Sequence, residues 1–138
     1  MRMAMQNDCS DRNLKRGAGG TVDIEFITQM LQLQHAQKDR SVLVQGTRDA
    51  IARFKSLGIL DATTADRLTE GYQSLRSVEA RLRLMNTTAR HDLPQAPKQL
   101  AKLAYLLGYE DATLMSNEVS QQRKTIREIF DRILPTTQ

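Results

Sequence analysis

A chain of 138 residues fits a single domain, and its 40% of hydrophobic residues can build a modest core. With three Phe, three Tyr and no Trp, that core must consist mainly of Leu, Ile, Val, Ala and Met, which is typical of a helical bundle. The net charge of +4 is a mild excess that permits an anionic partner, but the arginines are spread along the chain and do not form the basic stripe of a nucleic-acid-binding fold.

The N-terminal part of the chain is predicted to hold a glycine-rich loop. Residues 1–8 suit one or two helical turns, and residues 9–20 are rich in Asp, Ser, Asn and Gly, as loops are. Gly17, Gly19 and Gly20 fall within four positions, directly before a helical pattern. Glycine adopts positive φ and lets other groups come close. Because a plain turn would need only one or two glycines, we expect a specialised loop here.

The spacing of apolar residues predicts a helix over residues 22–37. The pattern repeats every three or four positions, at Val22, Phe26, Met30 and Leu33, and a second apolar row makes this face wide enough for a central helix. Thr21 is the expected N-cap, because its hydroxyl can accept a hydrogen bond from a free backbone N–H. Asp23 and Glu25 lie in the exposed first turn, where negative charge complements the helix dipole.

Capping residues bound the next two predicted helices. Thr47 is expected to cap a helix over residues 47–57, with Gly58 as its C-terminal stop. Asp61 is expected to cap a longer helix that ends near Thr88. The apolar residues of this long helix recur every three or four positions: Ala65, Leu68, Tyr72, Leu75, Val78, Leu82 and Met85.

Two further helices complete the chain. Pro97 suits the first turn of one, which Gly108 stops, and Asp111 can open the last, which Pro135 ends. Their expected inward-facing residues are Leu100, Leu103, Tyr105, Leu106, Leu107, Leu114, Val119, Ile126, Ile129, Phe130 and Ile133. No segment shows the strict alternation of a half-buried strand. The fold class is therefore all-α, an antiparallel bundle of about five helices with a Gly-rich N-terminal loop.

The glycine-rich loop is also a candidate phosphate site. Backbone N–H groups in such a turn, with a helix N-terminus behind them, can bind phosphate, and Lys15 and Arg16 add positive charge. The loop is not a Walker A sequence, because no Gly-Lys-Ser/Thr ends it, and no strand precedes it as in a dinucleotide fingerprint. The alternative, favoured by the pattern alone, is a tight loop whose glycines are needed for packing.

The two acidic residues behind the loop cannot form a paired acid/base site. Asp23 and Glu25 are two positions apart, so on a helix their side chains diverge by about 200°. Asp23 is the better candidate to point into the site of a neighbouring domain. The residues expected near a nucleotide are Lys15, Arg16, Gly17, Gly19, Gly20, Asp23 and Glu25.

The sequence offers little support for other site chemistries. His35 and His91 stand in no metal-ligand spacing, so no metal site is expected. Cys9 is the only cysteine, which excludes an internal disulfide and fits a reducing compartment. No apolar run approaches the ~20 residues that span a bilayer, and residues 1–11 lack the apolar core of a signal peptide. We therefore expect a cytoplasmic protein that binds neither membrane nor nucleic acid.

Residues 13–29 read Asn-Leu-Lys-Arg-Gly-Ala-Gly-Gly-Thr-Val-Asp-Ile-Glu-Phe-Ile-Thr-Gln. They resemble the Lys-x-Gly-x-Gly-Gly-x-x-Asp-Ile-Glu-Phe-x-x-Gln signature of the glutamine synthetase adenylyltransferases, which follows a nucleotidyltransferase domain and opens a helical domain. Val22 departs from the pattern, since relatives often carry Arg there. The resemblance extends over residues 13–134 through further stretches in the family's order: 30–35, 71–79, 91–94 and 103–109.

The resemblance implies a parent enzyme that transfers AMP from ATP to a tyrosine of glutamine synthetase and can also remove it. Such enzymes hold ATP and Mg²⁺ with a Gly-Ser element and paired aspartates. This chain has no Gly-Ser dipeptide and no Asp-x-Asp, so we expect no catalytic residue in it, no activity alone and no cofactor bound by it alone. The implied partners are the preceding nucleotidyltransferase domain, glutamine synthetase and a nitrogen-signalling regulatory protein.

The expected organisation is a linker over residues 1–20, from a missing nucleotidyltransferase domain, and a helical bundle domain over residues 21–138. Two alternatives stay open. The related uridylyltransferases share a Gly-Gly-x-x-Asp loop, so the chain could be their helical domain, although the fuller Asp-Ile-Glu-Phe favours an adenylyltransferase. A pure protein-docking module is the other alternative, but such a module has no need of three glycines beside Lys15.

Overall fold

The computed structural model describes residues 13–85 and 92–134 of the chain. Five α-helices and one short 3-10 helix form within them, and outside the helices two residues, Asn13 and Asp92, make an isolated antiparallel bridge. The elements in chain order are α2 (Thr21–His35), η1 (Arg40–Val42), α3 (Thr47–Ser56), α4 (Ala62–Leu84), α5 (Pro97–Leu106) and α6 (Ala112–Ile133). The described residues contain no strand, so the predicted all-α bundle of about five helices is confirmed.

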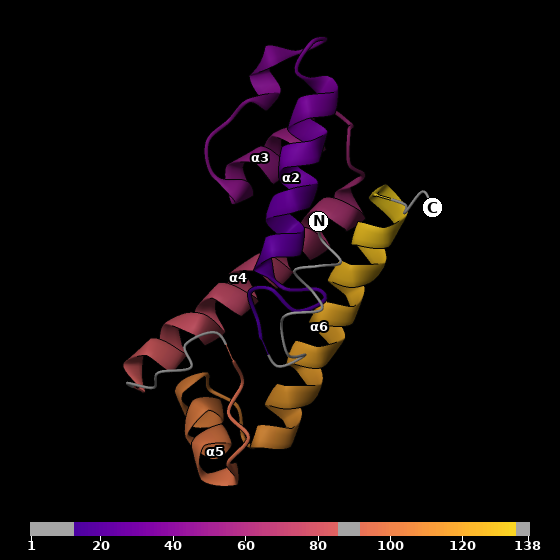
Figure 1. Ribbon diagram of the computed structural model, residues 1–138. Coiled ribbons are helices and arrows are strands. Elements are labelled where there is room, and N and C mark those ends of the chain that lie inside the picture. Colours follow the sequence, from indigo (N-terminus) through magenta and orange to yellow (C-terminus); the bar gives the residue numbers. More distant parts are fainter. Residues whose placement is uncertain (1–12, 86–91, 135–138) are drawn as a thin grey trace.

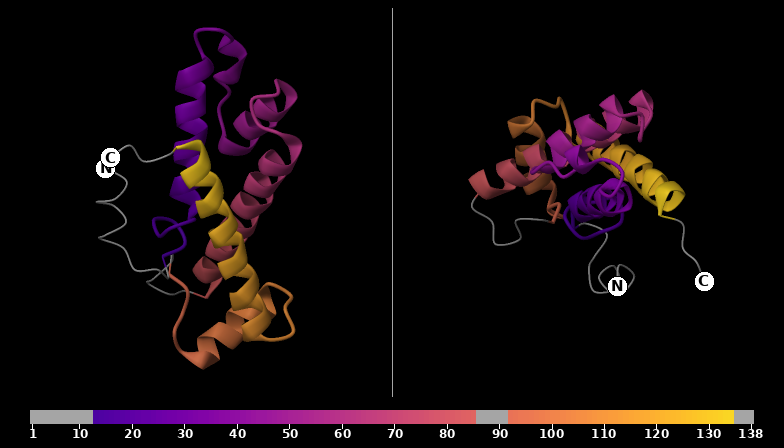
Figure 2. Two further views of the ribbon diagram at one scale, coloured as in Figure 1. Left: turned by 90° about the vertical axis from the view of Figure 1, so that its right-hand side faces the viewer. Right: turned by 90° about the horizontal axis from the view of Figure 1, so that it is seen from above.

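The two longest helices, α4 and α6, pack against each other through the middle of the molecule (Figure 1). Helices α2 and α3 lie toward one end, and the short α5 closes the other end (Figure 2). Helix α6 contacts α2, α4 and α5, so it joins the two ends. The fully buried side chains come from every α-helix and include Leu14 of the loop, Ile24, Phe54, Leu75, Leu103 and Ile126.

Two of the four predicted N-caps are confirmed. The Asp61 carboxylate accepts a hydrogen bond from the N–H of Thr64 at the start of α4, and Asp111 accepts one from Leu114 at the start of α6. Thr21 and Thr47 are instead the first helical residues, and Gly20 and Gly46 hold the N-cap positions without a side-chain bond. The predicted Thr caps are therefore wrong by one residue.

Several side chains expected on the apolar helix faces are exposed, Phe26 among them at 37%. Leu33 is 73% exposed, Tyr105 is 80% exposed and Leu114 is 50% exposed. In α5 the reason is a narrow contact face: Leu103 and Ala104 are buried against the neighbouring long helices, and the next residue along, Tyr105, turns about 100° away from Ala104. A three-or-four spacing places residues on one broad face but does not say where that face ends.

The boundaries of the other predicted elements agree with the structure to within a few residues. Helix α2 ends at His35 instead of residue 37, and Pro97 occupies the first turn of α5 as expected. Helix α4 ends at Leu84, four residues before the expected Thr88, and α6 ends at Ile133, just before Pro135. The turns expected over residues 1–8 lie outside the described residues. No helix in the described ranges has the length and apolar character needed to cross a membrane.

Candidate functional site

The glycine-rich loop, residues 13–20, is a closed turn organised by Asn13. The Asn13 side-chain oxygen accepts hydrogen bonds from the N–H groups of Lys15 at 3.0 Å and Arg16 at 2.8 Å. Its carbonyl oxygen accepts from Gly17 at 3.0 Å. Lys15 is half-buried and Arg16 is exposed, so the turn itself presents these two candidate cations.

The loop folds back so that its own carbonyls cap α2. The N–H of Thr21 donates to the Leu14 oxygen at 3.1 Å, and the N–H of Val22 donates to the Lys15 oxygen at 2.9 Å. The N–H of Gly20 is bonded within the loop as well, to Gly17 at 2.9 Å. These are the donors that a phosphate at a helix N-terminus would use. Contacts with an anion would therefore come from side chains, and the backbone cradle expected from the sequence is occupied by the chain itself.

Two of the glycines are required by contacts within the chain. Gly19 has φ +74°, and a Cβ added to it would lie 2.0 Å from the carbonyl oxygen of Arg123 in α6. A Cβ added to Gly20 would lie 2.6 Å from the carbonyl oxygens of Leu14 and Lys15. The first glycine lets the loop lie directly on α6, and the second lets the loop close on itself. The geometry thus supports the packing explanation of these glycines.

Asp23 is buried and faces the loop and α6. Its side chain is only 4% exposed, so the expectation of an exposed first-turn carboxylate is wrong. The carboxylate accepts a hydrogen bond from the N–H of Gly19 at 2.8 Å, and Nη1 of Arg127 lies 3.7 Å away. Burial raises the pKa of Asp23 from its usual 3.8 to about 6. The hydrogen bond from Gly19 and the charge of Arg123 lower this pKa, whereas the charge of Asp131 raises it further.

Glu25 points to a different part of the bundle. Its carboxylate accepts a hydrogen bond from the Tyr72 hydroxyl of α4 at 3.3 Å. Asp23, in contrast, meets the loop and α6. The predicted divergence of the two acidic side chains is therefore confirmed, and together they form no acid/base pair.

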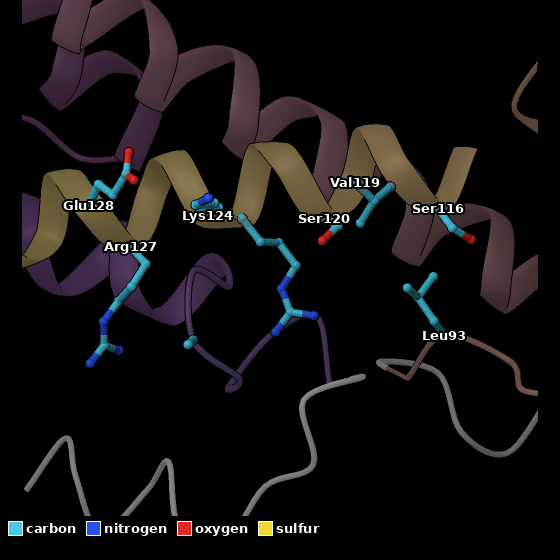
Figure 3. A pocket seen from close by; sticks show the side chains of 9 residues that line it. Leu93, Ser116, Val119, Ser120, Lys124, Arg127 and Glu128 are labelled. Carbon is cyan, nitrogen blue, oxygen red and sulfur yellow. The ribbon is translucent and has the colours of Figure 1, made fainter. Parts of the chain in front are cut away.

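A groove of about 550 Å³ runs along α6 beside the glycine-rich loop (Figure 3). Arg127 and Glu128 extend from α6 in different directions, and Leu93 lies beside the stretch of α6 that carries Ser116 (Figure 3). The lining residues are Ala18, Leu93, Ser116, Val119, Ser120, Arg123, Lys124, Arg127 and Glu128. Three of them are cationic and one is acidic, so the groove is suited to an anion.

The cations of the groove are held to different degrees. Arg123 donates from Nη2 to the Asn13 carbonyl at 3.2 Å, which ties α6 to the loop. Arg127 lies between two carboxylates, that of Asp23 and that of Asp131, and its Nε is 3.2 Å from the Asp131 carboxylate. The Arg127 guanidinium also lies over the Phe130 ring. Lys124 is exposed. We therefore expect Lys124 to be the cation most available to a ligand.

The α6 residues of the groove are absent from the candidates expected from the sequence. None of those seven candidates lines the groove. The structure brings Gly19 and Asp23 against α6, and the other five also lie off the groove lining: Lys15, Arg16, Gly17, Gly20 and Glu25. The sequence pattern that could have indicated this groove is the Arg123-Lys124 pair followed by Arg127, one helical turn after Arg123. Within the described ranges, no group of three or more His, Cys, Asp or Glu side chains is placed to hold a metal ion.

Comparison of the sequence with known proteins shows which family the chain belongs to. The model for GlnD PII-uridylyltransferase matches residues 2–134. Relatives named bifunctional glutamine synthetase adenylyltransferase/adenylyl-removing enzyme include those of Rhizobium meliloti, 31% identical over 88% of this chain and 12% of the relative, and Chromobacterium violaceum, 30% identical over 96% of this chain and 15% of the relative. The relative from Neisseria meningitidis serogroup B is 30% identical over 88% of this chain and 14% of its own length.

The chain thus spans only 12% to 15% of the length of these relatives. The motif of residues 13–29 predicted a resemblance to the glutamine synthetase adenylyltransferases. The names of these relatives, and alignments that cover 88% to 96% of this chain, confirm that resemblance. Because the family model matches almost every residue, the chain belongs to the GlnD PII-uridylyltransferase family and corresponds to a helical segment of the glutamine synthetase adenylyltransferases.

Proposed function

We propose that this chain is the helical domain of an enzyme that adenylylates glutamine synthetase and removes the adenylyl group. The observation that carries the proposal is the cationic groove of Arg123, Lys124 and Arg127, built beside the loop that is the family's signature. We propose that this groove and the loop side chains of Lys15 and Arg16 face the nucleotide held by the preceding nucleotidyltransferase domain. The chain alone is inactive and contains no catalytic residue.

The cofactors of the proposed parent are ATP and Mg²⁺. Bound Mg²⁺ neutralises the triphosphate during such transfer, and that chemistry belongs to carboxylates outside this chain. What this chain supplies is positive charge near the phosphates, since cationic side chains form strong charge-assisted bonds to phosphate oxygens. Arg123 and Arg127 are already held by Asn13 and Asp23, so they keep the groove open and its wall rigid.

The proposed partners follow from the relatives' names and from the family. They are the preceding nucleotidyltransferase domain, glutamine synthetase as the target and a nitrogen-signalling regulatory protein that docks on the helical surface. The proposed location is the cytoplasm. Neither a nucleic acid nor a membrane is among the proposed partners.

A second candidate function is supported by the family model itself, which is named for PII-uridylyltransferase. In that case the same loop and groove would face a uridylyl donor, and the target would be a PII protein. The named relatives favour adenylyl transfer, because the proteins of Rhizobium meliloti, Neisseria meningitidis and Chromobacterium violaceum are adenylyltransferases at about 30% identity to this chain.

A chimera tests the proposed function. The matching segment of the Rhizobium meliloti relative is replaced by residues 13–134 of this chain, and transfer of AMP to glutamine synthetase is measured. We expect an active chimera, and we expect Lys124→Gln within it to lower kcat/KM for ATP by about tenfold, the equivalent of one charge-assisted contact. Lys102→Gln, an exposed lysine of α5, is the matched control and should leave kcat/KM unchanged.

The outcomes of this experiment separate the two parts of the proposal. A folded but inactive chimera would contradict the assignment of the domain. Equal kcat/KM values for the Lys124→Gln and Lys102→Gln chimeras would remove the groove from nucleotide handling. If the chimera with UTP instead of ATP modifies a PII protein and not glutamine synthetase, the uridylyltransferase candidate is correct.

A further inference from the structure

Helices α3 and α4 pack together (Figure 1). A second hollow of about 460 Å³ lies on α4 and is bordered by one residue of α3. Arg48 of α3 and Arg76 and Arg83 of α4 line it, with Tyr72, Ser77 and Ala80. It shares no residue with the groove on α6. Among the described residues, none that line this hollow is acidic.

Two of the three arginines are held in place without being neutralised. Arg48 donates to the side-chain oxygen of Gln73, from Nε at 3.1 Å and from Nη2 at 2.7 Å, when the amide is oriented with its oxygen toward the guanidinium. The guanidinium of Arg76 lies over the Tyr72 ring, 5.8 Å from its centroid. The ring is fixed in turn by the hydrogen bond from its hydroxyl to Glu25 at 3.3 Å.

The ion pairs that join two described residues link Lys55 to Asp66 and Arg127 to Asp23 and Asp131. None of them involves an arginine of this hollow. Three exposed positive charges therefore surround the hollow. Among the residues that the structure describes, no carboxylate lies within ion-pair distance of these three arginines. Uncompensated charge of one sign in a concave site attracts an oppositely charged partner.

The spacing of the arginines indicates the shape of that partner. Arg76 and Arg83 are seven residues apart, so they lie on the same face of α4 about 10.5 Å apart along its axis. Each guanidinium can bind its own carboxylate through charge-assisted bonds of about 2.7–2.9 Å. A helix with carboxylates at positions i and i+7 repeats the same spacing. The small side chains of Ser77 and Ala80 leave room between the arginines for its backbone.

We propose that this hollow docks an acidic helical segment of a partner protein. Carboxylates two turns apart on that segment bind Arg76 and Arg83, and Arg48 receives a third acidic group from the α3 side. The site is distinct from the proposed nucleotide groove, and its use as a docking surface does not depend on which nucleotide the parent enzyme transfers.

Peptide binding to the 138-residue chain tests the proposal. The probe is a fluorescein-labelled helical peptide of about 15 residues with Glu at i and i+7 on one face, and its control has Gln at both positions. At about 50 mM salt we expect binding by the Glu peptide alone, with backbone NMR shifts at α3 and α4 and with weaker affinity as salt rises. Arg76→Gln/Arg83→Gln should weaken binding at least about fivefold.

Matched variants keep the proposal open to contradiction. Arg67→Gln removes an exposed α4 arginine that lines a different hollow and should leave the affinity unchanged. Arg76→Lys/Arg83→Lys keeps the charge and should restore part of the affinity, which separates charge from any loss of folding. Failure of the Glu peptide to bind would overturn the proposal, as would equal weakening by Arg67→Gln, shifts confined to α6, or full displacement of the peptide by inorganic phosphate.

Discussion

At the scale of single residues, Gly19 and Asp23 fix the glycine-rich loop on the bundle. Gly19 brings the loop backbone against the carbonyl of Arg123, and its N–H bonds to the Asp23 carboxylate at 2.8 Å. The hydrogen bond from Arg123 to Asn13 closes the contact from the other side at 3.2 Å. The signature residues therefore hold the loop in one position beside the groove, and this structural role is compatible with a nearby nucleotide.

Gly19→Ala should destabilise the isolated chain by at least about 3 kcal/mol. Positive φ alone costs alanine about 1 kcal/mol, and here the new methyl would also lie 2.0 Å from a backbone oxygen, which cannot move without shifting α6. Gly58→Ala is the matched control, since Gly58 has φ +75° and open space for a Cβ, so about 1 kcal/mol is expected. Chemical denaturation measures both. Equal losses would show that the loop does not rest on α6.

The raised pKa of Asp23 predicts a pH-dependent stability. Because the folded-state pKa of about 6 lies above the usual 3.8, the folded chain binds this proton more tightly than the unfolded chain. The stability that the protonated Asp23 side chain contributes to the fold is complete below about pH 3.8 and is lost as the pH rises through about 6. Asn cannot titrate, so the free energy of unfolding, relative to Asp23→Asn, should fall between about pH 4 and 6 and then stay level. Urea denaturation across this range measures it, and a difference that rises with pH would contradict the buried geometry.

At the scale of the elements, the starts of α2, α4 and α6 separate into two kinds. Helices α4 and α6 begin with aspartate caps, whereas the first N–H groups of α2 donate hydrogen bonds to the carbonyls of Leu14 and Lys15 in the folded-back loop. A local pattern identifies the first kind, because the capping residue and its target are three positions apart. The second kind depends on where the preceding loop goes.

Asp111→Ala should cost about 1 kcal/mol of stability, because its carboxylate accepts the Leu114 N–H at 2.8 Å and alanine cannot. Thr47→Ala is the control. Thr47 is of a residue type that often caps helices, but it makes no capping bond here. Its replacement by alanine should therefore cost less than about 0.5 kcal/mol of stability. Thermal or urea denaturation gives both values. A larger loss from Thr47→Ala than from Asp111→Ala would show that the cap assignments are reversed.

The sequence predicted the helices and their order because apolar spacing and caps are local signals. It did not predict that Tyr105 faces solvent, since the width of the buried face of α5 is set by its neighbours. It also missed the groove, because the groove depends on contacts such as Arg123 with Asn13, 110 positions apart. The burial of Asp23 depends on tertiary packing as well, because the Gly19 N–H of the folded-back loop and Arg127 of α6 lie against its carboxylate.

At the scale of the whole molecule, α6 connects the groove with the helix that carries most of the second hollow. One side meets the loop and forms the groove proposed to face the nucleotide, and α4, packed on another side of α6, carries Arg76 and Arg83 of the proposed docking hollow. Both surfaces are cationic, yet the described residues contain no cluster able to hold a metal ion. Both surfaces therefore offer positive charge to anionic groups, one beside the loop and one on α4.

The isolated 138-residue chain should therefore transfer no AMP. Nucleotidyl transfer requires carboxylate-held Mg²⁺, and the sequence contains no Asp-x-Asp and no Gly-Ser element. The test incubates the pure chain with ATP, Mg²⁺ and glutamine synthetase and follows the mass of the synthetase subunit. A full-length relative provides the positive control. Adding the nucleotidyltransferase segment of that relative in trans should restore transfer only if the two parts associate. AMP transfer that co-elutes with the chain itself through gel filtration would show that it holds a catalytic site.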